Sequence, residues 1–227
     1  MARDGQQPHQ PTRRSQPGAK KERIIQVAVD FFGRYGYEQT KWADVAAEVH
    51  IGSTALYHYF ESKQHCLFEI MARTLLDVQE RFEGIVASQT DWTDALLEEL
   101  LASFDLTDED VLKLRVLAAQ HGRVATPRTN PREEAARVSA LTRKRELERA
   151  WSAFLLRGME EDVLPPNDPR LLARAVLGLY NSVWVWYQPR KRRELHEVAR
   201  FFVGRQLALV GLDPAIADAR LSALAAA

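Results

Sequence analysis

The sequence has little that would support an extracellular or membrane-bound protein. Its 227 residues include a single cysteine, Cys66, which excludes an internal disulfide and suits a small core residue. No apolar run approaches the roughly 18 residues that a membrane-spanning helix needs, and the N-terminus has no apolar signal core. We therefore expect a soluble, cytoplasmic protein that does not enter a membrane.

Signatures of catalysis are also missing. There is no Gly-rich nucleotide loop, no Ser nucleophile elbow and no H-E-x-x-H or comparable histidine spacing. His65 beside Cys66 is only a weak metal signal, and paired acids such as Glu160 and Glu161 fall at predicted helix ends, where charge is usually structural. We expect no catalytic residues, no metal and no cofactor.

What the sequence does have is a helix-turn-helix pattern over residues 40–63. Its first segment places apolar residues at i, i+3, i+4 and i+7 of a helix, namely Trp42, Val45, Ala46 and Val49. Gly52 then supplies a turn and Ser53 a cap for the next helix, in which Leu56 and Phe60 share the inward face. The opposite face carries Ser53, Thr54, Tyr57 and His58.

Small polar groups with a tyrosine and a histidine suit the floor of a DNA major groove. The structural alternative is a helical hairpin inside an all-α core, since this spacing is common. The run LYHYFESK (residues 56–63) resembles the end of the helix-turn-helix in the TetR family of bacterial transcriptional regulators. The chain departs from that family's pattern at the turn and the start of the second helix, at His50, Gly52, Thr54 and Ala55.

The resemblance implies a helical head that binds double-stranded operator DNA. We expect Thr40, Lys41, Tyr57 and Lys63 to contact phosphates, and Ser53, Thr54 and His58 to lie nearest the base edges. Residues 1–18 have almost no apolar content and read as a disordered basic arm. Five bases lie in or just after this arm and are candidates for phosphate contact: Arg13, Arg14, Lys20, Lys21 and Arg23.

The whole chain predicts an all-α protein. Helices are expected at residues 20–35, 62–85, 92–104, 108–124, 131–162, 169–187 and 194–211, besides the two short ones of the helix-turn-helix. We assign residues 19–65 to the DNA-binding domain and residues 66–227 to a ligand-binding and dimerisation domain. The last two helices carry more apolar surface than one small domain needs, which favours a homodimer formed through them over an internal core.

The second domain also has aromatic and polar residues suited to a small-molecule site, although each alone is explained by a core or a solvated face. The candidates are Arg115, His121, Trp151, Phe154, Val176, Tyr180, Asn181 and Trp184. Residues 181–189 follow the pattern N-x-x-x-x-W-Y-x-P and resemble a TetR subgroup, several members of which respond to acyl-CoA thioesters. The bases at residues 190–193 would form the rim of such a site.

Together these features predict a homodimeric, ligand-responsive regulator, most simply a repressor released from its operator by a small hydrophobic effector such as an acyl-CoA. Two alternatives come from other classes: a helical protein-interaction module that does not bind DNA, and a small all-α enzyme.

Overall fold

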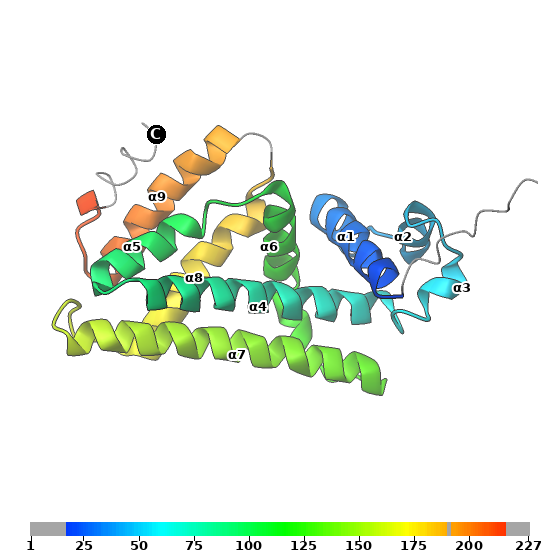
Figure 1. Ribbon diagram of the computed structural model, residues 1–227, viewed down its shortest axis with the longest axis horizontal. Helices are drawn as coiled ribbons and strands as arrows, with labels where there is room; N and C mark the ends of the chain where they lie inside the picture. Colours follow the sequence, from blue (N-terminus) through cyan, green and yellow to red (C-terminus); the bar gives the residue numbers. More distant parts are fainter. Residues whose placement is uncertain (1–16, 190–191, 217–227) are drawn as a thin grey trace, which may run out of the picture.

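The computed structural model describes residues 17–189 and 192–216, which form helices joined by short loops and contain no β-strand (Figure 1). The all-α prediction is therefore confirmed for this part of the chain. The α-helices are α1 (Pro17–Tyr35), α2 (Trp42–Glu48), α3 (Ser53–Leu56), α4 (Lys63–Ser88), α5 (Trp92–Ala102), α6 (Asp108–Gln120), α7 (Pro131–Glu160), α8 (Pro169–Trp186) and α9 (Arg192–Val210), with a 3₁₀ turn, η1 (His121–Ala125), after α6.

Capping by nearby residues explains why most of the helix ends could be predicted from the sequence. The side chains of Asn130 and Asp168 each accept two backbone N–H groups of the first turn of α7 and α8. Thr107 and Asp110 form a reciprocal capping box at the start of α6. Gly36 takes a φ of 94° directly after α1, a left-handed conformation that ends the helix at little steric cost.

The turn between α2 and α3 differs from the prediction. The left-handed residue is His50, with a φ of 56°, at one of the positions where the chain departs from the TetR pattern. Gly52 has an ordinary extended conformation (φ −67°, ψ 147°) and occupies the N-cap position of α3. Ser53 is the first helical residue and does not cap the helix, so that expectation was wrong. The non-glycine residue at the turn carries a modest strain.

The head formed by α1, α2 and α3 does not have a core of its own. Its buried cluster continues into α4 through Cys66, Leu67 and Phe68, which have no exposed surface. It also takes in Leu112 from α6, against which Gly33 of α1 packs so closely that a Cβ at residue 33 would lie 2.8 Å from the Leu112 Cβ. The small head therefore depends on α4 and α6 for part of its core.

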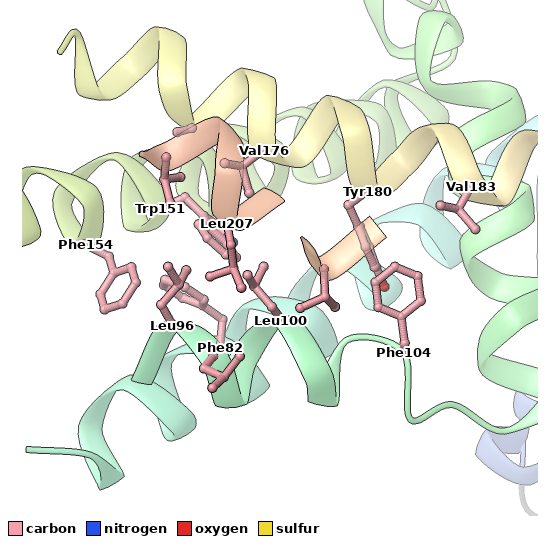
Figure 2. Close-up of a cluster of buried hydrophobic side chains, with 14 of the residues drawn as sticks. Phe82, Leu96, Leu100, Phe104, Trp151, Phe154, Val176, Tyr180, Val183 and Leu207 are labelled. Atoms are coloured by element: carbon pink, nitrogen blue, oxygen red, sulfur yellow. The ribbon is translucent and has the colours of Figure 1, made fainter. Parts of the chain in front are cut away.

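The rest of the molecule is built around a second, aromatic core (Figure 2). Phe154 of α7 stacks on Trp92 of α5 with ring centroids 4.8 Å apart, and Phe82 of α4 stacks on Trp151 at 4.7 Å. The indole N–H of Trp92 donates to the Phe154 carbonyl oxygen at 2.8 Å. Rings contributed by three helices therefore fix how α4, α5 and α7 lie against one another.

Two long helices, α4 and α7, lie side by side and run from the head to the far end of the molecule (Figure 1). Helix α6 packs against α1 of the head on one side and against α8 on the other. The head is thus held both by the continuous helix α4 and by α6. None of the helices described is long and apolar enough to cross a membrane.

Candidate DNA interface and effector cavity

The outward face of α3 and the turn after it matches the sequence prediction. Its expected DNA contacts are all exposed: Ser53, Thr54, Tyr57 and His58. On the opposite side Leu56 and Phe60 have no exposed surface. The hydroxyl group of Tyr57 therefore sits on a side chain that is about half exposed (52 %) and free to meet a phosphate or a base edge. DNA contact by these residues remains a prediction.

Of the three other expected DNA contacts, one is exposed and two are bonded to backbone carbonyl groups of the head. Lys41 is exposed at the N-cap position of α2. Thr40 is buried, and its hydroxyl donates to the Gly36 carbonyl oxygen at 2.8 Å. The Lys63 ammonium donates to the carbonyl oxygens of Tyr37 and Thr40 at 2.7 and 2.9 Å, and burial lowers its pKa. Thr40 and Lys63 therefore brace the loop before α2, a role that sequence spacing did not reveal.

Two bases next to the expected basic arm also serve the head itself. The Lys20 ammonium donates to the Val49 carbonyl oxygen at 3.0 Å, at the end of α2. Lys21 forms an ion pair with Glu69 of α4 at 2.7 Å. The arm before Pro17 lies outside the described residues.

A cavity of about 400 Å³ lies among α4, α6, α7, α8 and η1, within the usual range of roughly 300–1,000 Å³ for small-molecule sites. Its wall is mainly apolar: Met71, Leu75, Leu117, Ala118, Val124, Ala140, Leu177, Gly178 and Val185. Its polar lining consists of His121, Lys144, Glu148, Arg174, Asn181 and Ser182. An apolar wall with a few polar groups suits a largely hydrophobic ligand with a polar end.

Two of the predicted ligand residues, His121 and Asn181, line this cavity. The Nδ1 atom of His121 lies 2.8 Å from the Ala118 carbonyl oxygen, which fixes the ring at the start of η1. Arg115 does not line the cavity; its Nε donates to the Gly33 carbonyl oxygen at 3.0 Å and its Nη1 to that of Tyr187. Arg115 of α6 thus ties the end of α8 to α1 of the head.

The five remaining predicted ligand residues are packed in the aromatic core and do not line this cavity: Trp151, Phe154, Val176, Tyr180 and Trp184. Tyr180 illustrates the reason (Figure 2). Its ring makes edge contacts with Phe104 and Trp184, and its hydroxyl donates to the Ser103 carbonyl oxygen at 2.9 Å. Tyr180 and Trp184 do lie one turn apart on α8, but the space beside them is filled by Phe104 of the loop after α5.

Sequence reasoning missed the residues that α4 and α7 contribute to the cavity. Met71 and Leu75 are one turn apart on α4, where apolar periodicity does not distinguish a cavity wall from a packed core. Lys144 and Arg174 lie at the polar side, on α7 and α8, where they share the carboxylate of Glu148 at 3.9 and 3.6 Å. They supply positive charge at the cavity; Arg190 and Lys191, expected at its rim, lie outside the described residues.

One acidic side chain is buried in the aromatic domain. Glu99 of α5 is 2 % exposed, and burial raises its pKa to about 7, with the charge of Arg81 acting in the opposite direction. Its Oε2 atom has no hydrogen-bond partner among the described residues. Burial in this position favours the protonated form of the carboxyl group, because the ionised form loses its contact with water.

Comparison with known proteins agrees with this geometry. The model described as "Bacterial regulatory proteins, tetR family" matches residues 24–70, and that described as "Tetracyclin repressor-like, C-terminal domain" matches residues 109–210. The chain belongs to the TetR family. It is a DNA-binding transcriptional regulator, with its helix-turn-helix in the matched N-terminal segment.

Similar TetR relatives include repressors named KstR2. That of Mycolicibacterium smegmatis is 26 % identical over 186 residues, which cover 77 % of this chain and 82 % of the relative. That of Rhodococcus jostii is 27 % identical over 192 residues, covering 81 % and 87 %.

Solved TetR structures share the fold. AibR, solved in complex with isovaleryl coenzyme A and operator DNA, matches with a TM-score of 0.68 and 20 % identity over 86 % of this chain and 98 % of AibR. PfmR of Thermus thermophilus matches with a TM-score of 0.64 and 27 % identity over 84 % and 99 %. The all-α architecture with an N-terminal head is thus that of the TetR family.

Proposed function

We propose that this TetR regulator is a homodimeric repressor whose operator complex is released by a hydrophobic effector in the cavity among α4, α6, α7 and α8. The position of the cavity carries this proposal. Its wall includes α4, which continues into the head, and α6, which packs on α1. A ligand that fits the cavity better in one arrangement of these helices shifts the population toward that arrangement, and only this difference in affinity drives release.

The proposed subunit contact is the outer face of α8 and α9. Trp186 and Phe201 are more than half exposed, and the ring of Phe202 lies 6.3 Å from that of Trp186. An apolar patch of this kind is typical of an interface, and a helix-turn-helix protein reads two half-sites as a dimer. Changing Trp186 and Phe201 to Glu should give a monomer in sedimentation and weaken operator binding, while the helical circular dichroism remains.

We propose an acyl-CoA as the effector. The mainly apolar cavity suits an acyl chain, and Lys144 and Arg174 place positive charge at its polar side, where the phosphates of the carrier would lie. AibR, which shares the fold at 20 % identity, was solved with isovaleryl coenzyme A. An uncharged hydrophobic effector would fill the apolar part but leave these charges unused.

The test starts by selecting the operator from random duplexes with purified protein. The operator complex is then titrated with acyl-CoA thioesters of graded chain length and with the matching free acids. Release by thioesters and not by free acids supports the proposal. Ala140→Phe, which fills the cavity, should lower the affinity for the thioester, whereas Ala135→Phe, at an exposed position of the same helix outside the cavity, is the matched control. Release by no thioester would exclude this effector class and leave DNA binding untouched.

A further inference from the structure

A second hollow lies on the outer side of α7 and α8, directly beside the cavity. This arginine groove has a volume of about 660 Å³ and is lined by Arg145, Glu148, Arg149, Ser152, Ala153, Leu156, Pro169, Arg170 and Arg174. It shares Glu148 and Arg174 with the cavity wall, so the two hollows adjoin at that pair.

The groove collects positive charge from both helices. Arg145 and Arg149 are one turn apart on α7, and Arg170 and Arg174 are one turn apart on α8. Like charges four residues apart on a helix repel each other, so the folded chain gains nothing from this placement by itself. Four arginines face one glutamate in the groove lining.

The available carboxylates do not neutralise this charge. Glu148 lies 3.6 Å from Arg174 and is already shared with Lys144. Within residues 17–189 and 192–216, no carboxylate lies within ion-pair distance of the guanidinium groups of Arg145, Arg149 or Arg170. Three guanidinium groups therefore remain available to an anion, and guanidinium is well suited to phosphate through paired hydrogen bonds.

Operator DNA is not the anion that this groove meets. The groove uses the C-terminal half of α7 and the first turns of α8, while the head lies near the opposite, N-terminal end of α7 (Figure 1). The duplex on α3 and the groove therefore belong to different ends of the molecule. A small polyanion that also reaches the cavity explains both the arginine-rich lining of the groove and its position beside the cavity.

We infer that the arginine groove binds the phosphorylated nucleotide end of the effector, while the acyl chain enters the adjoining cavity at Glu148 and Arg174. This inference rests on the proposed effector class. Arg145, Arg149, Arg170 and Arg174 hold the phosphates, and the apolar surface of Ala153, Leu156 and Pro169 receives the base. The groove selects a phosphorylated carrier, and the cavity selects the acyl group.

The test measures direct binding by titration calorimetry with free coenzyme A, which has the nucleotide end and no acyl chain. The wild-type protein should bind it saturably, with an affinity that falls as salt rises. Arg149→Gln and Arg170→Gln, which lie outside the cavity wall, should each weaken binding about tenfold, the loss expected for one charge-assisted hydrogen bond. Arg143→Gln is the matched control, since Arg143 lies on α7 outside the groove and pairs with Glu146.

Glu148→Gln provides a change in the opposite direction. Removing the carboxylate that Arg174 and Lys144 share should tighten coenzyme A binding several-fold, an outcome that loss of folding does not produce. Equal affinity of wild type, Arg149→Gln and Arg170→Gln for coenzyme A overturns the inference, and so does the absence of saturable binding.

The operator complex separates this inference from the proposed function. An acyl-pantetheine has the same acyl thioester without the nucleotide phosphates. Release at a much higher concentration of acyl-pantetheine than of acyl-CoA supports the groove. Release at equal concentrations overturns the groove but keeps the acyl effector, whereas failure of both compounds to release the operator contradicts the proposed effector class.

Discussion

The head and the effector domain use their polar residues in opposite ways. On the head, the side chains proposed to touch DNA stand outside a buried apolar layer, so that Tyr57 and His58 are exposed while Leu56 is fully buried. In the effector domain, polar groups such as Glu99 are buried between the helices. A DNA-contacting face is thus a local property of one helix, whereas a ligand site depends on the gaps left between several helices.

The two regions are not independent folding units. The head obtains part of its core from α4 and α6. A change at the shared boundary should therefore affect both regions, and a change deep in one of them should reveal how far the other depends on it.

The largest expected effect comes from that boundary. Phe68→Ala removes a fully buried ring of α4 from the head core and should cost about 3–5 kcal/mol of unfolding free energy. We expect one transition at lower temperature when helical circular dichroism and operator binding are followed together. Leu156→Ala, at an exposed site on α7, is the control. Loss of DNA binding with an unchanged unfolding temperature would show that the head unfolds separately.

A second prediction tests the buried acid of the effector domain. The pKa of Glu99 is raised to about 7 in the folded protein, so its contribution to stability is complete below pH 4.5 and is lost as pH rises through 7. This should remove roughly 2–3 kcal/mol from the unfolding free energy between these limits.

Glu99→Gln should abolish that part of the pH dependence and make the protein more stable than wild type at pH 8. Glu98→Gln, on the same helix and hydrogen-bonded to Gln89, is the matched control. Urea denaturation at several pH values measures the unfolding free energy. If this free energy falls with pH as steeply in the Glu99 variant as in the wild type, other groups cause the pH dependence.

The sequence predicts the head and the helix limits better than it predicts the effector site. The long helices and their starts were accessible because caps such as Asn130 and Thr107 act within one turn of the chain. The inward and outward faces of α3 followed from periodicity. The bonds of Lys63 to backbone carbonyls in the loop before α2 could not be predicted, because they join residues more than twenty positions apart.

The effector site was less accessible for a physical reason. Aromatic residues at helical spacing fill a core as readily as they line a pocket, and which of the two occurs depends on the partner helix. Trp151 and Phe154 meet rings of α4 and α5 and leave no gap. His121 and Asn181 line a cavity because the facing positions on α4 and α7 carry Met71 and Ala140, which do not fill it.

A third prediction concerns the connection between the two regions. Arg115→Gln should retain effector binding, since Arg115 does not line the cavity, but should reduce the effector-induced loss of operator affinity about tenfold. The reason is that its bonds join the end of α8 to α1. Operator affinity with and without effector, together with direct effector titration, gives the two quantities, and Arg143→Gln is the control. Full release in the variant would mean that coupling runs through α4 alone.

An effect of similar size to that of Arg115→Gln is expected on the DNA face. Tyr57→Phe removes an exposed hydroxyl and should weaken binding to all duplexes by about 1–2 kcal/mol, because it loses a hydrogen bond to a charged phosphate. Tyr35→Phe removes a hydroxyl from another exposed tyrosine, at the end of α1, and should change nothing.

His58→Ala should alter sequence preference as well as affinity, which binding-site selection measures. An unchanged preference would move His58 from base reading to backbone contact. An effect of Tyr35→Phe equal to that of Tyr57→Phe would show that the DNA-contacting surface extends beyond α3.

The close approach of Gly33 to Leu112 limits how this regulator can exchange parts with its relatives. Residue 33 has no room for a side chain while leucine occupies position 112, and the carbonyl of the same glycine receives Arg115. Joining the head of one regulator to the second domain of another within the continuous helix α4 would separate α1 from the surface of α6 that fits it. New operator specificity is therefore obtained most easily by substitutions in α3 alone. A head transferred to another regulator should also need the residues at positions 112 and 115 to be transferred.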